Sequence, residues 1–174
     1  MNTLHQKAQR GLSYLEVVLV VVLIGSLIAV AAARLLPYVD HAERIAVLRL
    51  EGQLRSVLLL EAAKRISNGE SESLTELHSS NPMALLLQPP ANYLGELTAP
   101  VPHELPERTW HFDTERRQLV YRAGSGFRFE GADPVIHDYR VELAFEDVDQ
   151  DAAFVAGTDE FLGLRLMGPG IRFE

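Results

Sequence analysis

The chain has 174 residues and a formal net charge of −8, with 16 basic and 24 acidic residues. Residues 1–11 hold two of the basic residues and no acidic one, which leaves 14 basic against 24 acidic residues in the rest. This balance excludes general nucleic-acid binding, which needs a basic face to neutralise phosphates. The chain has no cysteine, so an exported domain is held together by its core or by neighbouring subunits, without disulfides.

The first element is an apolar segment, residues 12–34, that follows the basic leader 1–11. From Leu12 to Ala33 every residue is apolar or small except Glu16. These residues form a helix of about 33 Å at about 1.5 Å per residue, which is enough to cross a bilayer core. Positive charge before such a segment keeps this end cytoplasmic, so we expect a single-pass membrane protein with its C-terminal part outside.

The apolar segment also carries a candidate cleavage site for secretion. Ala31, Ala32 and Ala33 resemble the small-residue site of a signal peptide, and cleavage after Ala33 would release a periplasmic domain that begins at Arg34. Signal-peptide cores usually run about 7–15 apolar residues and do not begin with a glutamate. The pattern therefore favours a retained anchor, with secretion as the alternative.

Residues 35–67 continue the helix in amphipathic form. One stripe at helical spacing is apolar: Val47, Leu50, Leu54, Val57 and Leu58. Charged residues fall largely elsewhere on the wheel: Glu43, Arg44, Arg49, Glu51 and Arg55. Asn68 or Gly69 is expected to end the helix. We expect one helix from about Leu12 to Ile66, with a stripe for packing on its second half.

The remaining residues, 68–174, form the predicted head domain. Six of the nine prolines lie between residues 81 and 106, which predicts loop with one helical turn around Met83 to Leu87. Apolar and polar residues then alternate in five segments, 108–113, 117–122, 127–130, 138–146 and 160–167. The sequence therefore predicts an α+β fold, in which the long N-terminal helix packs against a small antiparallel β-sheet domain.

The segment GLSYLE, residues 11–16, carries a family resemblance, because its glutamate is the fifth residue after a glycine. It resembles the precursors of type IV pilins and of the pseudopilins of type II secretion. The resemblance implies a prepilin peptidase that cuts between Gly11 and Leu12 and methylates the new amino group of Leu12. It also implies an inner-membrane protein with a periplasmic head, which an assembly platform and a cytoplasmic ATPase build with other pilin subunits into a pilus or pseudopilus filament.

The sequence departs from the family pattern in three respects, which bear on the choice between a major and a minor subunit. Leu12 replaces the phenylalanine that often follows the cleaved glycine, Ala33 stands where many major pilins have proline, and the C-terminal cysteine pair of many major pilins is absent. The last two departures argue against a major subunit. We therefore expect a minor or accessory pilin, for which the resemblance suggests the mannose-sensitive haemagglutinin kind, with a type II secretion pseudopilin as the alternative.

Glu16 is the predicted assembly residue. A carboxylate in the bilayer centre costs about 2.5–3.5 kcal/mol, so it needs a partner or must lie near the interface. Cleavage after Gly11 would create an ammonium at Leu12, one helical turn from Glu16. That ammonium can pair with a carboxylate of its own chain or of the next, and the pair offsets the cost of burial.

The other candidate site is acidic. Asp147, Asp149 and Asp151 alternate as at the start of a calcium loop, but the glycine and glutamate that such a loop requires later are replaced by Ala152 and Thr158. A solvated acidic turn is the favoured interpretation, and a Ca²⁺ ion held with the help of Asp159 or Glu160 is the alternative.

No other group of residues predicts catalysis or a metal centre. His103, Glu107 and His111 have the spacing of a helical zinc set, but Pro106 prevents that helix. We therefore expect a structural protein without enzymatic activity and without a cofactor other than that Ca²⁺. Its partners are the peptidase, the assembly platform, other subunits and membrane lipid.

Overall fold

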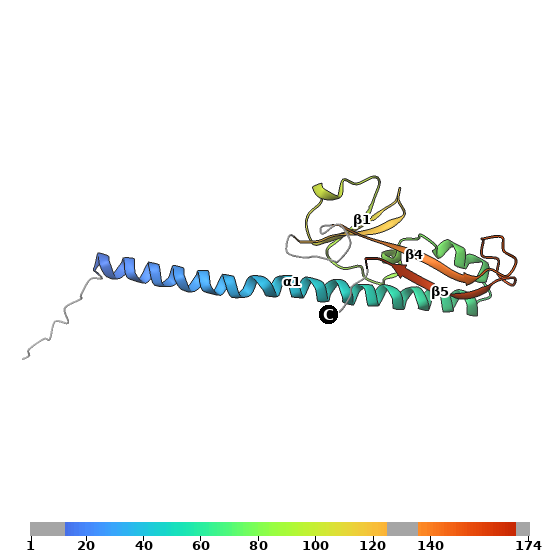
Figure 1. Ribbon diagram of the computed structural model, residues 1–174, viewed down its shortest axis with the longest axis horizontal. Helices are drawn as coiled ribbons and strands as arrows, with labels where there is room; N and C mark the ends of the chain where they lie inside the picture. The colour runs from blue at the N-terminus through green and yellow to red at the C-terminus, as the bar shows by residue number, and fades with distance from the viewer. Residues whose placement is uncertain (1–12, 125–135, 170–174) are drawn as a thin grey trace, which may run out of the picture. The chain divides into compact units, whose positions relative to one another are not determined.

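The computed structural model describes residues 13–124 and 136–169 (Figure 1). The elements are the helix α1 (Tyr14–Ser67), the 3-10 helices η1 (Ser71–Leu77), η2 (Pro82–Leu85) and η3 (Pro102–Glu104), and the strands β1 (Tyr93–Leu97), β2 (Thr109–Asp113), β3 (Gln118–Arg122), β4 (Ile136–Glu146) and β5 (Glu160–Met167). The α+β class is confirmed. The strand predicted at 127–130 lies outside the described residues.

The chain divides into two compact units, Met1–His41 and Ala42–Glu174. In the first, the described residues after Ser13 belong to α1, whose segment Tyr14–Leu35 is long and apolar enough to cross a membrane. The second unit combines the C-terminal half of α1 with all five strands.

The helix ends where the sequence predicts. Gly69 has a φ of +76°, a left-handed conformation that glycine adopts without strain. Its N–H donates to the carbonyl of Ile66 (3.0 Å), and the N–H of Glu70 donates to the carbonyl of Arg65 (2.8 Å). These bonds satisfy carbonyls of the last turn and stop α1 at Ser67.

The apolar stripe of α1 forms one side of the core of the second unit. Val47, Leu50, Leu54 and Leu58 are buried, as predicted, whereas Val57 is half-buried. They share one cluster with residues of the sheet: Trp110, Phe112, Leu119, Tyr121, Tyr139, Val141 and Leu166. A second, smaller cluster joins Ala62 of α1 to Leu74 and Leu77 of η1. The packing of the sheet on the second half of the helix is therefore present in the structure.

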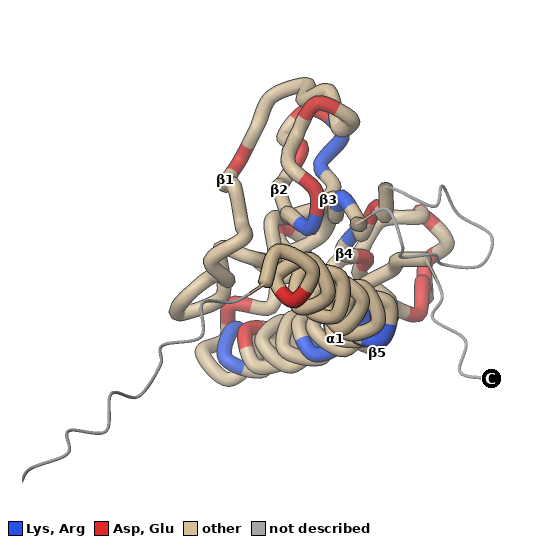
Figure 2. The backbone as a smooth tube through the Cα atoms, turned by 90° about the vertical axis from the view of Figure 1, so that its left-hand side faces the viewer, with Lys and Arg blue, Asp and Glu red and all other residues tan. Residues whose placement is uncertain are grey.

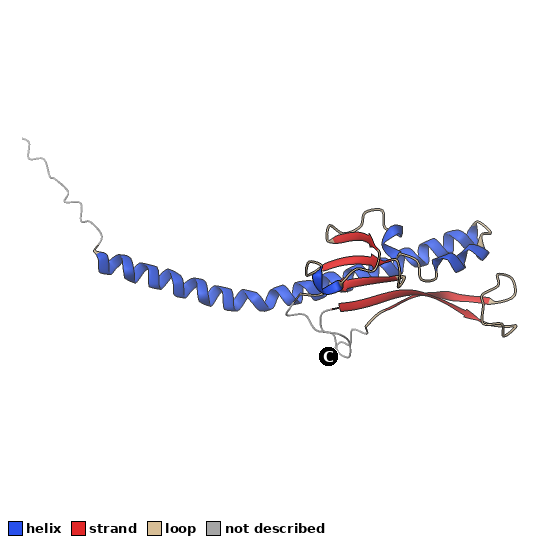
Figure 3. Ribbon diagram, turned by 90° about the horizontal axis from the view of Figure 1, so that it is seen from above, coloured by secondary structure: helices blue, strands red, loops and turns tan. Residues whose placement is uncertain are grey.

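The prediction of a purely antiparallel sheet is wrong, because the sheet is mixed. The strand order is β1-β2-β3-β4-β5, and Figure 3 shows the strands side by side in this order. Strands β2 to β5 pair antiparallel, in segments that agree with the predicted ones within two residues. Strand β1 pairs parallel with β2, and it lies in the proline-rich region predicted to be loop.

The connection between β1 and β2 is long, as parallel pairing of the two strands requires. Parallel neighbours cannot be joined by a tight hairpin, so residues 98–108 must cross a face of the sheet. In Figure 1 this connection, which carries η3, lies on the side of the sheet away from α1. Strand β1 is fixed at both ends, because Trp110 N–H donates to Asn92 O (2.9 Å) and Thr114 N–H donates to Leu97 O (2.9 Å). The high proline content of the surrounding region predicts loop, although the five residues of β1 themselves include no proline.

Candidate functional sites

The first candidate site is the apolar N-terminal part of α1. The segment Tyr14–Leu35 has 22 residues, a mean hydropathy of 2.8 and no buried residue. Glu16 lies in its first turn and is exposed. The predicted cleavage residues, Gly11 and Leu12, lie outside the described residues.

The place of Glu16 in the first turn has an electrostatic consequence. The unpaired N–H groups at the start of a helix carry partial positive charge, so a carboxylate there is stabilised by about 0.3–1 kcal/mol. This term is smaller than the cost of about 2.5–3.5 kcal/mol for a carboxylate deep in a membrane. A cationic partner is therefore still required if Glu16 enters the hydrocarbon.

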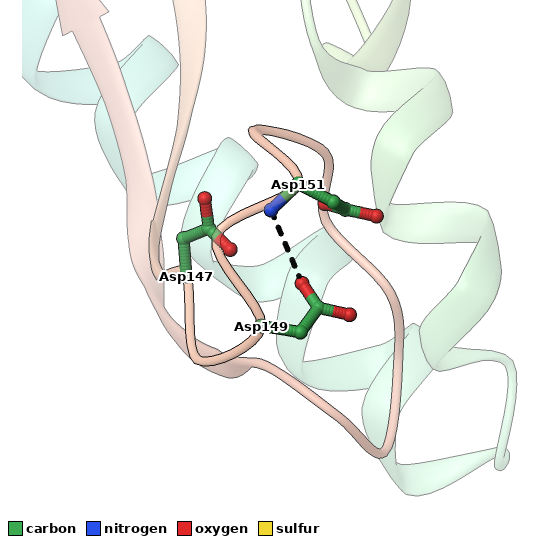
Figure 4. Close-up of side chains that lie close together, drawn as sticks. All are labelled: Asp147, Asp149 and Asp151. Carbon is green, nitrogen blue, oxygen red and sulfur yellow. Dashed lines mark hydrogen bonds between the residues drawn. The ribbon is translucent and has the colours of Figure 1, made fainter.

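The second candidate site is the loop between β4 and β5. Oxygen atoms of Asp147, Asp149 and Asp151 all lie within 4.8 Å of one another (Figure 4). In the described part of the chain, this is the one group of His, Cys, Asp or Glu residues close enough to share a cation. The predicted acidic set is thus brought together, whereas His103, Glu107 and His111 form no such group.

Backbone hydrogen bonds shape this acidic loop. The N–H of Ala152 donates to Asp147 Oδ2 (2.9 Å), that of Asp151 to Asp149 Oδ1 (3.4 Å) and that of Ala153 to Asp151 Oδ1 (2.7 Å). Partial desolvation by the neighbouring loop raises the pKa of Asp149, the hydrogen bond from the N–H of Asp151 acts in the opposite direction, and the negative charges of Asp151 and Asp159 raise the pKa further. The three carboxylates offer oxygen ligands, but Ca²⁺ takes about 6–8 of them.

Asp159 does not extend this set as a ligand in the structure. Its Oδ1 accepts the N–H of Val148 (2.9 Å) and its Oδ2 accepts the N–H of Val155 (2.7 Å). Both carboxylate oxygens therefore close the loop onto itself. Glu160, the other residue expected to bind the cation, is exposed at the start of β5. Its backbone lies opposite that of Glu146 in the pairing of β5 with β4.

A buried charge cluster at Glu43 was missed by the sequence reasoning. Glu43 is only 7% exposed. Its Oε2 accepts from Arg108 Nε (2.7 Å), and its Oε1 accepts from the hydroxyl of Tyr121 (2.8 Å) and from the N–H of Gly124 (2.7 Å). The hydrogen bond to Glu43 raises the pKa of Arg108, and burial raises that of Tyr121. One carboxylate thus joins α1 to β3 and to the segments flanking β2 and β3.

Glu51 repeats this arrangement two turns further along α1. It is 6% exposed, its Oε1 accepts from the hydroxyl of Tyr139 on β4 (2.8 Å), and its Oε2 lies 3.6 Å from Arg55. Burial raises the pKa of Glu51. The signal that could have found both residues is their spacing, because Glu43, Val47 and Glu51 follow one another at four-residue intervals on the same stripe.

The chemistry of these two carboxylates is structural. Each is enclosed between the helix and the sheet and accepts a hydrogen bond from a tyrosine hydroxyl. Buried polar groups with all partners in place fix one relative position of the packed elements. Glu43 and Glu51 therefore set the register of the second half of α1 against β3 and β4.

His111 is a buried polar residue of the described core. It lies on β2 with 0% of its surface exposed, and neither ring nitrogen has a hydrogen-bond partner among the described residues. Burial lowers the pKa of His111, and the charges of Asp113 and Asp138 act in the opposite direction. The ring is thus held where its protonated form is disfavoured.

Comparisons with models of protein families, with curated proteins and with solved structures find no match to this chain.

Proposed function

We propose that this chain is a pilin-like structural subunit of a type IV pilus, of the minor or accessory kind. A prepilin peptidase removes residues 1–11 and methylates Leu12, and an inner-membrane assembly platform then adds the subunit to a helical filament of pilins. The observation that carries this proposal is Glu16, five residues after Gly11 and alone in an apolar helix. Cleavage after Gly11 creates the cation that this carboxylate needs.

The arrangement of the elements supports a structural role. Tyr14–Leu35 has no buried residue, whereas the second half of α1 forms the core of a folded unit with the sheet. A single helix can thus serve as a membrane anchor before assembly and carry a periplasmic head. The subunit acts by polymerisation and performs no chemical reaction. This role needs no cofactor.

A type II secretion pseudopilin is the alternative within the same family, because it shares the cleavage motif. The remaining rival is a periplasmic domain released by signal peptidase after Ala33. The sequence Ala31 to Ala33 favours that rival, and the glutamate near the start of the apolar segment opposes it.

The first test identifies the mature amino terminus by intact mass and N-terminal sequencing of protein taken from membranes. We expect a chain that begins with N-methylated Leu12. Gly11→Ala should give an uncut precursor, and the matched variant Ala33→Leu should be processed like the native chain. A mature chain that begins at Arg34, or a block of processing by Ala33→Leu alone, would establish the signal-peptide alternative.

The second test separates processing from assembly. Glu16→Ala removes the intramembrane charge, so it should insert and be cleaved like the native chain but be absent from sheared filaments. Ser26→Ala is the control, because the Ser26 hydroxyl only donates to the carbonyl of Leu23 in the same helix (2.8 Å). Normal incorporation of cleaved Glu16→Ala would refute the assembly role. Loss of surface filaments together with intact type II secretion would separate the pilus from the pseudopilus.

A further inference from the structure

A groove on the folded unit has no role in the function proposed above. It lies between α1 and the segment that follows η2, and it has a volume of about 690 Å³. Eight residues line it: Arg49, Gly52, Gln53, Ser56, Val57, Leu86, Leu87 and Gln88. A Cβ atom at Gly52 would meet nothing within 4 Å, and Ser56 turns its hydroxyl back to the carbonyl of Gly52 (2.9 Å). Small side chains thus keep this part of the helix surface open.

The chemistry of the groove is apolar with hydrogen-bond donors around it. Leu87 is fully exposed, and Val57 and Leu86 are half-buried beside it. Arg49, Gln53 and Gln88 offer guanidinium and amide N–H groups, and none of the eight lining residues is acidic. An exposed leucine that is flanked by donors fits a segment with one apolar side chain between carboxylates.

The charge distribution of the chain favours such a segment from a second copy. Residues 42–67 have five basic and three acidic residues, and two of the acidic ones, Glu43 and Glu51, are buried. Residues 68–174 have eight basic and nineteen acidic residues. Figure 2 shows Lys and Arg recurring along α1, whereas most Asp and Glu lie on the strands and loops. The helix surface of one copy is therefore electrostatically complementary to the strand and loop surface of another.

One loop of the described chain has the required pattern. In residues 146–151, EDVDQD, the side chain of Val148 is 62% exposed between Asp147 and Asp149. The carboxylates of Asp147, Asp149 and Asp151 are held together at the tip. Val148 can contact Leu87 while the carboxylates of Asp149 and Asp151, which are both exposed, accept from Arg49 and the glutamines.

We propose that the groove binds the β4–β5 loop of a second copy of this chain. The two surfaces differ, so the contact is heterologous, and it joins two adjacent copies of this subunit in a filament without making them a symmetric pair. This inference rests on the proposed function and deepens it, because it names the face by which one subunit contacts the next.

The absence of cysteine from the chain allows a direct test by disulfide cross-linking. Two differently tagged full-length copies are expressed together, one with Gln88→Cys and the other with Gln150→Cys, and membranes are oxidised. We expect a mixed-tag dimer. The matched control pairs Gln88→Cys with Glu115→Cys, an exposed acidic position on the β2–β3 turn, and should give at least tenfold less dimer. Equal yields from the two pairs, or a predominant Gln88–Gln88 dimer, would overturn the proposal.

Charge exchange tests the same contact without relying on proximity alone. Arg49→Glu in the groove copy, or Asp149→Arg in the loop copy, should each lower the cross-link yield about tenfold, and the two changes together should restore it. Arg116→Glu, on the exposed β2–β3 turn, should leave the yield unchanged. Failure of the double exchange to restore the yield would overturn the proposed pairing.

The mature amino terminus is measured in the same samples. A chain that begins at Leu12 but forms no specific cross-link would overturn this inference and leave the pilin proposal intact. A specific cross-link in a chain that is not cut after Gly11 would instead preserve the contact and refute the pilin proposal.

Discussion

The carboxylate of Glu43 on α1 accepts a hydrogen bond of 2.8 Å from the hydroxyl of Tyr121 on β3, which is 78 residues further along the chain. The same carboxylate accepts from Arg108 and from the backbone of Gly124. Removal of a buried acceptor takes one hydrogen bond away from each of its donors, at a cost of about 1–3 kcal/mol for each buried group. Glu43 should therefore contribute more to stability than a surface ion pair.

Glu43→Ala is expected to lower the free energy of unfolding by about 3–5 kcal/mol, because it removes the buried acceptor shared by Arg108, the Tyr121 hydroxyl and the Gly124 N–H. Tyr121→Phe should cost about 1 kcal/mol, and the double variant less than the sum of the two. The measurement is urea unfolding followed by the fluorescence of Trp110, the single tryptophan, whose ring centroid lies 4.5 Å from that of Tyr121. Glu72→Ala, an exposed control on η1, should change stability by less than about 0.5 kcal/mol. Additive losses would show that the hydrogen bond is not coupled.

Two glycines should respond to alanine in opposite directions. A Cβ at Gly168 would clash with Cδ1 of Tyr139, whose side chain is buried with only 2% exposed. Gly168→Ala is therefore expected to cost about 1–3 kcal/mol. Gly52 lies inside α1 with free space around it, so Gly52→Ala should stabilise the fold by about 1 kcal/mol through helix propensity. The same Trp110 assay measures both, and a neutral Gly168→Ala would contradict the close approach to Tyr139.

The two buried glutamates show what a local sequence pattern cannot predict. The stripe Val47 to Leu58 is predictable because apolar residues repeat at helical spacing, and β2 to β5 because polarity alternates along them. The pattern places Glu43 and Glu51 largely away from the apolar stripe, since charge usually stays in water. Their burial depends on tyrosines on β3 and β4, and such partners far along the chain leave no local pattern.

Proximity at the acidic loop was predictable, but its internal bonding was not. Alternation of three aspartates in a turn brings their carboxylates together, as the structure has them. Asp159 was expected to assist a cation, but its two oxygens accept the backbone N–H groups of Val148 and Val155. Sequence spacing cannot distinguish a carboxylate that closes a loop from one that faces a ligand, because both need the same residue type.

The folded unit should lose stability in mild acid because of His111. Burial lowers the pKa of His111, so the unfolded chain, with a histidine pKa of about 6.5, binds the proton more readily than the folded chain. Stability is therefore fully present above about pH 6.5 and falls as the pH drops from there toward the lowered pKa. Burial also raises the pKa of Glu51. The folded chain therefore binds this proton more readily than the unfolded chain, so Glu51 adds stability as the pH falls, in a range closer to the ordinary pKa of a carboxyl group.

The test of His111 compares the unfolding midpoint at pH 7.5 and at pH 5.5 in the native chain and in His111→Leu. The apolar variant should be at least as stable at pH 7.5, because it removes two buried nitrogens without partners in the described core, and its midpoint should fall less in acid. The exposed His103→Gln is the control and should follow the native profile. An identical pH profile for His111→Leu would rule out His111 as the source of the acid sensitivity.

The last prediction concerns which part of the chain folds without the membrane segment. Residues 42–174 form a compact unit that contains the stripe Val47 to Leu58 and the sheet it covers. A fragment 42–174 should therefore be soluble and show cooperative unfolding of the Trp110 environment. A fragment 68–174 lacks the stripe, so one apolar face of its sheet is bare and it should aggregate in size-exclusion chromatography. Leu54→Ala in the longer fragment, at a site with 0% exposure, should cost about 2–5 kcal/mol. Equal solubility and equal unfolding midpoints for the two fragments would refute the role of α1 as the cover of the sheet.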